Sequence, residues 1–78
     1  MGRVMNRFDL ESIQNKELHM HSACAACRFV GFEKWNGEDT VFDHIDVEAN
    51  GVPETVYGPI AEKIIAEAKC TYEDVDVV

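Results

Sequence analysis

The chain has 78 residues and a formal net charge of −8 at pH 7, with 46% hydrophobic and 28% charged residues. This length closes one hydrophobic core, so we expect a single domain over residues 1–78 that has no room for a large internal active site. The composition is typical of a folded globule, and the negative charge disfavours direct binding to nucleic acid or to an anionic membrane surface.

The first segment, from Val4 to Lys16, allows two interpretations. Its apolar positions alternate at first and then shift by three residues. A strand over about residues 5–10 and a short helix capped by Asp9 therefore both stay open.

The segment from Leu18 to Trp35 has the alternation of an extended chain, although residues 23–27 could form one helical turn. Residues 28–35 are rich in aromatic and β-branched side chains and are followed by Asn36-Gly37. This dipeptide is the strongest short signal for a hairpin. A second strand over residues 40–48 is expected to follow.

The hairpin turn sets a register that places Phe32 opposite Val41, Val30 opposite Asp43 and Lys34 opposite Asp39. Such a register divides the side chains of the two strands between a core face and an outer face. The core face is expected to carry Val30, Phe32, Val41, Ile45 and Val47, and the outer face Phe42, His44, Asp46 and Glu48. Asp43 falls among the apolar residues, which indicates a bulge or a rim position.

The clearest helix follows a second turn at Asn50-Gly51. Residues 52–54 can form at most a short edge strand, because Pro53 cannot donate to a ladder. The helix is expected to start at Gly58 and Pro59, with the proline in the first helical position. Its apolar stripe is formed by Ile60, Ala61, Ile64, Ile65 and Ala68, and its solvent-exposed face by Glu62, Lys63, Glu67 and Lys69.

The tail, residues 71–78, alternates acidic and apolar side chains and is predicted to form a final strand. Val75 and Val77 would lie on one side of it, and Asp74 and Asp76 on the other. Taken together, the segments predict an α+β fold, a small antiparallel sheet of three to five strands with one amphipathic helix packed on one face.

Three cysteines, Cys24, Cys27 and Cys70, are an odd number, which fits a reducing compartment better than a disulfide framework. No stretch approaches the roughly 18 apolar residues of a membrane span, and the first residues lack the apolar core of a secretory signal. We therefore expect a cytoplasmic protein.

The densest set of possible metal ligands is His19, His21, Cys24 and Cys27, which lie within nine residues. Zinc takes four such ligands in a tetrahedron. Structural zinc sites usually join separated segments, whereas these four ligands come from one local stretch, and Cys70 or His44 could replace one of them. The favoured interpretation is that the two neighbouring cysteines are small buried apolar residues and that the histidines lie on a solvent-exposed strand face.

No motif of catalysis accompanies these residues. Cys24 and Cys27 lack a βαβ context, and Arg28 is the one cation beside them, which disfavours thioredoxin-like chemistry. The sequence also lacks a nucleophile elbow, a calcium-loop spacing and a glycine-rich phosphate motif. We expect a non-enzymatic protein without catalytic residues and without a cofactor.

The negative charge is concentrated in residues 35–78, which carry eleven carboxylates and two lysines. A one-sided acidic field steers a small protein toward basic partners. We expect the carboxylates of the hairpin and the tail to converge in one anionic patch that binds a partner protein. The expected partner-binding residues are Glu38, Asp39, Asp43, Asp46, Glu48, Asp74 and Asp76.

Small size, acidity and a simple α+β layout without a catalytic motif, as in the acidic stretch from Glu38 to Glu54, resemble the small inhibitors encoded by phages and mobile elements. Anti-CRISPR proteins and DNA mimics belong to this class. Its members share no common sequence, so no residue role is carried over. The resemblance implies stoichiometric blocking of a nucleic-acid-handling complex, in the host-cell cytoplasm if the chain is phage-encoded.

The leading hypothesis is therefore a non-enzymatic acidic binding protein, an inhibitor that occupies a basic, nucleic-acid-binding surface of a partner protein. Two alternatives stay open. One is a small zinc-stabilised module that uses His19, His21, Cys24 and Cys27. The other is a homodimeric accessory subunit that pairs through the helix stripe or an unpaired strand edge.

Overall fold

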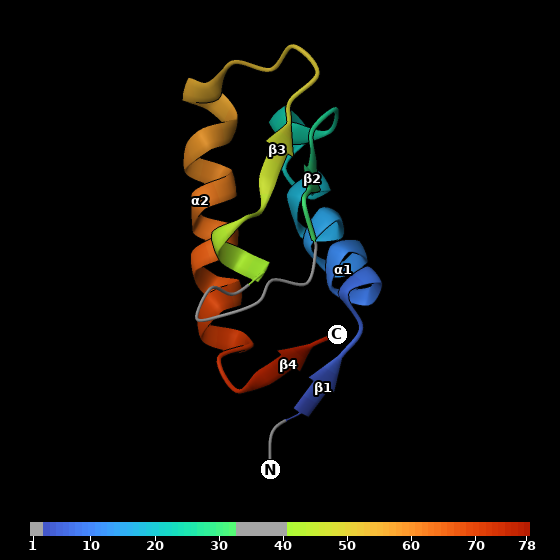
Figure 1. The fold of residues 1–78 in the computed structure, drawn as a ribbon. Helices are drawn as coiled ribbons and strands as arrows, with labels where there is room; N and C mark the ends of the chain where they lie inside the picture. Colours follow the sequence, from blue (N-terminus) through green and yellow to red (C-terminus); the bar gives the residue numbers. More distant parts are fainter. Residues whose placement is uncertain (1–2, 33–40) are drawn as a thin grey trace.

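The computed structural model in Figure 1 describes residues 3–32 and 41–78. In chain order it contains β1 (Arg3–Met5), α1 (Arg7–His19), the 3-10 helix η1 (Ser22–Cys24), β2 (Arg28–Val30), the 3-10 helix η2 (Val41–Asp43), β3 (Asp46–Glu48), α2 (Glu54–Thr71) and β4 (Val75–Val77). This is a small α+β protein, as predicted. However, the described residues form two helices and two small two-stranded sheets, not the predicted single sheet of three to five antiparallel strands with one helix.

Helix α1 begins after Asn6, whose side-chain Oδ1 accepts a hydrogen bond from the Phe8 main-chain N–H at 2.7 Å. Asp9 lies in the first helical turn and is not the cap. The helix continues to His19, so the extended interpretation of the chain from Leu18 onward was wrong at its start. The reason is that Leu18 extends a buried row with a spacing of four residues, formed with Leu10 and Gln14.

Strands β2 and β3 form an antiparallel pair, which confirms that the two predicted hairpin segments meet. The register differs from the prediction, since Val30 lies opposite Asp46 and not opposite Asp43. The ladder is also shorter, because Val41 belongs to η2 and not to a strand. The predicted turn at Asn36-Gly37 and the pairing of Lys34 with Asp39 lie outside the described residues.

The predicted division of side chains between a core face and an outer face of the hairpin was partly wrong. Phe29, not Val30, is fully buried in β2, and Phe42 points into the core, where its ring stacks on Tyr72 with centroids 6.2 Å apart. The 3-10 turn at η2 rotates Phe42 inward, which an extended strand would not do. Asp46 and Glu48 are exposed, as predicted.

Helix α2 begins at Glu54, so residues 52–54 form no edge strand and Pro59 lies inside the helix. Pro59 is tolerated there because its missing N–H removes only one bond close to the helix start, the one to the Thr55 carbonyl. The predicted apolar stripe is confirmed. Ala61, Ile64 and Ala68 are buried, Ile60 and Ile65 pack beside them, and Glu62, Lys63, Glu67 and Lys69 are exposed.

The predicted tail strand is confirmed as β4, but its pairing is parallel. It lies beside β1 with Val4 opposite Asp76, so the two ends of the chain meet at the bottom of Figure 1. Val75 and Val77 are half-buried, whereas Asp74 and Asp76 are exposed.

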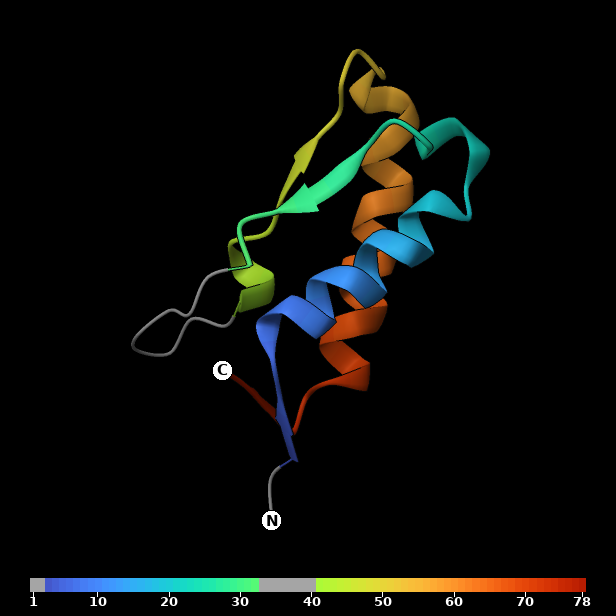
Figure 2. The same cartoon turned by 90° about the vertical axis from the view of Figure 1, so that its right-hand side faces the viewer.

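The core lies between the two helices and the β2–β3 pair, which runs along one side of them in Figure 2. Helix α1 contacts both β2 and α2, and α2 also contacts η1 and η2. The buried apolar residues are Leu10, Leu18, Cys24, Cys27, Phe29, Phe32, Val41, Phe42, Ala61, Ile64 and Ala68.

Candidate functional site

The described candidate carboxylates are exposed but do not form one patch. Asp43 ends η2, Asp46 and Glu48 lie on β3, and Asp74 and Asp76 lie at β4. Strand β3 runs beside β2 in the upper half of Figure 1, whereas β4 lies at the lower end beside β1. The expected convergence of hairpin and tail is therefore not found among these five residues. The other two candidates, Glu38 and Asp39, lie outside the described residues.

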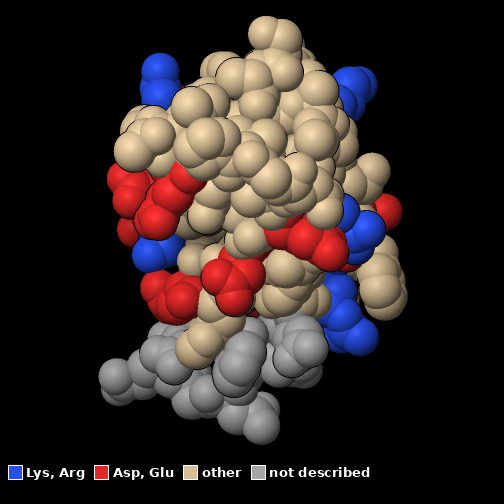
Figure 3. Space-filling view, turned by 90° about the horizontal axis from the view of Figure 1, so that it is seen from above, with Lys and Arg blue, Asp and Glu red and all other residues tan. Residues whose placement is uncertain are grey.

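Three of these carboxylates form exposed ion pairs with basic side chains from other elements. Arg3 Nη2 lies 3.1 Å from Asp74 Oδ1, Arg28 Nε lies 3.4 Å from Glu48 Oε2, and Lys69 Nζ lies 3.0 Å from Asp43 Oδ1. In the view of Figure 3, acidic and basic side chains are accordingly interspersed and not separated into two fields.

Asp46 and Asp76 differ from the other three described candidates, because neither has an ion-pair partner within residues 3–32 and 41–78. Asp46 lies on the same outer face of β3 as Glu48, two residues further along, and this places the two carboxylates about 7 Å apart. Asp76 lies on β4 opposite Val4 of β1.

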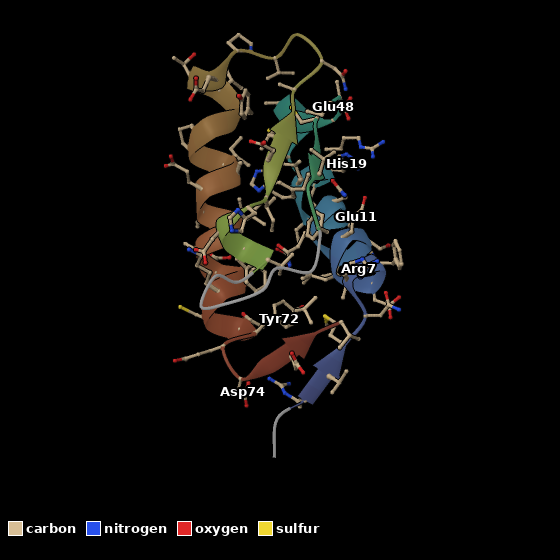
Figure 4. All side chains as sticks on the ribbon, viewed as in Figure 1. Arg7, Glu11, His19, Glu48, Tyr72 and Asp74 are labelled. Carbon is tan, nitrogen blue, oxygen red and sulfur yellow. The ribbon has the colours of Figure 1, made fainter. Side chains whose placement is uncertain are left out.

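The fold lowers the pKa of the Asp74 carboxyl group. The hydrogen bond from Arg3 lowers the pKa of Asp74 below its ordinary value of 3.8, with smaller contributions from the Asp74 main-chain N–H and from the charge of Arg3. Figure 4 shows Asp74 at the lower end of the molecule, at the turn that leads into β4.

The four proposed zinc ligands are not brought together as a site. Cys24 and Cys27 are buried and His19 and His21 are exposed, as predicted. The predicted strand face was wrong, because His19 is the last residue of α1 and His21 precedes η1. His19 Nε2 donates a hydrogen bond to the Cys27 main-chain carbonyl at 2.6 Å. Within residues 3–32 and 41–78, no group of three or more histidine, cysteine or acidic side chains is placed to hold a metal ion.

The sequence analysis did not identify the side chains that hydrogen-bond to the main chain of residues 26–29, which include Cys27. Asn15 and His19 are one helical turn apart on α1 and both bind main-chain groups of residues 27–29. Asn50, which has a positive φ of 50°, donates from Nδ2 to the Ala26 carbonyl at 2.8 Å. The spacing of four residues between Asn15 and His19 was the available signal, but it is informative only once this stretch is known to be helical.

A groove of about 570 Å³ lies between the C-terminal end of α1 and helix α2. Met20 is its most exposed apolar residue, with 79% of its surface accessible. The apolar lining consists of Met20, Pro59, Ile60 and Ile64, and the charged or polar rim of Glu17, His21, Lys63 and Glu67.

Comparison of the chain with known proteins gave no match. No family model, no curated protein and no solved structure matches the chain. Of α1 and α2, the helices in the part of the chain that the structure describes, neither has the length and apolar character needed to cross a membrane.

Proposed function

We propose that this chain is a non-enzymatic acidic binding protein that inhibits a partner by occupying its basic, nucleic-acid-binding surface. The observation that carries the proposal is the surplus of exposed carboxylates. The chain has 15 acidic and 7 basic side chains, and among the described residues Asp46 and Asp76 take part in no ion pair.

The existing ion pairs are compatible with this role because they are weak. The pairs of Asp43, Glu48 and Asp74 have side chains that are 41% to 71% exposed. Exposed pairs contribute about 0–1 kcal/mol and are screened by salt. Arginines of a partner can therefore displace Lys69, Arg28 or Arg3 at little cost.

Strand β3 is the proposed centre of the contact. Asp43, Asp46 and Glu48 follow each other over six residues, and all three are exposed. Duplex DNA carries one charge per roughly 1.7 Å of its axis, which is far denser than the spacing of about 7 Å along this strand. The proposal is therefore one of competition for selected arginine and lysine side chains, with fast, salt-sensitive association.

Affinity capture with charge-reversed baits tests this proposal. The double variant Asp46→Lys/Glu48→Lys should lose a partner that the native chain captures from its host. The control variant Glu11→Lys/Glu17→Lys changes the net charge equally but on helix α1, and it should retain that partner. Equal losses with both baits would show that net charge alone, and not β3, determines binding.

The inhibitory part of the proposal has a separate test. A captured partner that handles nucleic acid should bind either this chain or its nucleic acid, but not both, and one chain per partner should suffice. A ternary complex of partner, nucleic acid and this chain would contradict occupation of the nucleic-acid-binding surface.

A homodimeric accessory subunit is the second candidate, because the groove between α1 and α2 has a self-complementary rim. A two-fold axis through an apolar patch places each rim residue against its counterparts, so Lys63 of one copy could face Glu17 or Glu67 of the other. Sedimentation over a concentration series should then show a dimer that Met20→Glu dissociates. A monomer at all concentrations would exclude this candidate.

A further inference from the structure

The Cys24–Cys27 pair has no role in the proposed function, yet its geometry is well defined. The chain turns between these residues, and the Cys27 main-chain N–H donates to the Cys24 carbonyl at 3.0 Å. The turn directly follows η1 (Ser22–Cys24), and in such turns the side chains of residues three apart lie one above the other. Both cysteines accordingly face the core, with exposed fractions of 0% and 1%.

Two observations describe the environment of these thiols. Cys27 Sγ donates to the Ala49 carbonyl at 3.6 Å. Burial raises the pKa of the Cys24 thiol, and the neighbouring Cys27 raises it further. In the reduced protein, Cys24 is therefore an uncharged thiol held against a second sulfur atom.

The main chain around the pair is held in place from two sides. His19 on α1 binds the Cys27 carbonyl at 2.6 Å, and Asn50 binds the Ala26 carbonyl at 2.8 Å. Asn15 fixes both main-chain polar groups of Phe29 just beyond the turn. These bonds restrict the ways in which the two cysteines can move apart, so the thiols are positioned before any reaction.

We propose that Cys24 and Cys27 are a reversible disulfide pair that closes by exchange with a small-molecule disulfide of the oxidised glutathione class. The inference does not depend on the proposed inhibitory function. The Cα atoms of a turn lie less than about 7 Å apart, which is the range that a disulfide requires.

The reaction balances in two exchange steps. Because Cys27 is 1% exposed in the closed fold, the first step needs a local opening of the turn, in which the Cys27 thiolate attacks one sulfur atom of the small disulfide and releases one glutathione thiolate. The Cys24 sulfur then attacks Cys27 in the mixed disulfide and releases the second. One protein S–S bond forms, one small-molecule S–S bond is broken, and the two protons of the protein thiols pass to the two released thiols.

Burial favours a disulfide over a metal complex at this pair. A metal held by two thiolates would place ionised sulfur where exposure is 0% to 1%, and burying a charge is costly. A disulfide is uncharged and carries no such cost. Its formation removes the thiol hydrogen that Cys27 donates to Ala49, so oxidation loosens the link between this turn and the residue that follows β3.

The test measures the disulfide equilibrium in the folded and in the urea-unfolded chain. A Cys70→Ser background removes the third thiol, which is exposed on α2. The protein is equilibrated in buffers with set ratios of oxidised to reduced glutathione, starting from both redox forms. Acid quenching and mass determination then give the fraction that has lost two hydrogens.

The fold should favour the disulfide by about tenfold or more over the unfolded chain, equivalent to about 30 mV or more in reduction potential. By linkage, the oxidised protein should also melt at a higher temperature than the reduced one. An equilibrium constant in the folded protein equal to or below that of the unfolded chain would overturn the proposal.

Single-thiol variants serve as the matched control. Cys24→Ser and Cys27→Ser, each in the Cys70→Ser background, should form only a mixed disulfide with glutathione and should never lose two hydrogens. The comparison of folded and unfolded equilibria uses both native thiols, so it decides the question even if these variants fail to fold. Accumulation of the mixed disulfide in the folded two-thiol protein would also contradict the inference, because Cys24 should resolve it.

Discussion

Asn15 hydrogen-bonds both main-chain polar groups of Phe29. Its Oδ1 accepts from the Phe29 N–H at 2.6 Å, and its Nδ2 donates to the Phe29 carbonyl at 3.3 Å. Because β3 pairs with the other edge of β2, the amide takes the place of a further strand along the edge that faces α1. A helix side chain thus completes the hydrogen bonding of a strand whose central residue is fully buried.

Replacing Asn15 by alanine should lower the free energy of unfolding by about 2 kcal/mol, because two partly buried main-chain groups lose their partners. Urea unfolding followed by circular dichroism measures this change. The neighbouring variant Lys16→Ala removes an exposed side chain and should change stability by less than about 0.5 kcal/mol. Similar effects of the two substitutions would show that the amide bridge contributes little.

Gln14 is a weak point in the core and offers a stabilising substitution. Its side chain is 2% exposed, and its Oε1 has no hydrogen-bond partner among the described residues. Gln14→Leu removes an unsatisfied polar atom at nearly constant volume, so we expect a gain of about 1 kcal/mol in thermal or urea unfolding. Gln14→Glu is a control for which the opposite change in stability is expected. Its buried carboxyl group should destabilise the fold most at neutral pH. A loss of stability in Gln14→Leu would indicate that the amide has a partner.

The α2 stripe and the β4 strand could be predicted from the sequence, because each depends on a local period. Ala61, Ile64 and Ala68 repeat at helical spacing, and Val75 and Val77 alternate as in a strand. The parallel pairing of β4 with β1 could not be predicted, since strands of three residues at the two chain ends carry no signal for each other.

The predicted register of the hairpin was wrong for a specific reason. The predicted register assumed that the strands continue to a two-residue turn, but Gly31 leaves the strand with a φ of +85°. Its Cα–H side faces the carbonyl of His44, so the chain is held there by a close main-chain approach that no pattern of apolar residues encodes. The expected acidic patch is not found among the described carboxylates for a related reason. A count of charges along the sequence does not show that β3 and β4 lie at different ends of the molecule (Figure 1).

Gly31→Ala should be more damaging than Gly51→Ala, although both glycines have positive φ angles of +85° and +93°. A Cβ atom at Gly31 would lie 2.8 Å from the His44 carbonyl oxygen, whereas at Gly51 it would meet nothing within 4 Å. Gly51→Ala should cost about 1 kcal/mol for the left-handed backbone alone, and Gly31→Ala about 2–3 kcal/mol or more. Urea midpoints of the two variants measure the difference, and equal midpoints would contradict the close approach.

The pair of Arg3 and Asp74 gives a prediction for pH dependence. Since the hydrogen bond from Arg3 lowers the pKa of Asp74 from 3.8 in the folded state, the pair stabilises the fold above that pH. The contribution is lost as the pH falls through the lower folded-state pKa, where the carboxylate becomes protonated. An NMR titration of the Asp74 carboxyl carbon should show a midpoint below 3.8 that rises in Arg3→Gln.

The control for this titration is Arg28→Gln, which removes the cation beside Glu48 and should leave the Asp74 midpoint unchanged. Added salt should raise the Asp74 midpoint in the native chain, because both side chains of the pair are mostly exposed and their attraction is screened. The stability difference between the native chain and Arg3→Gln should likewise shrink as the pH falls below the folded-state pKa. A midpoint that is the same in Arg3→Gln as in the native chain would show that Arg3 does not hold this carboxylate.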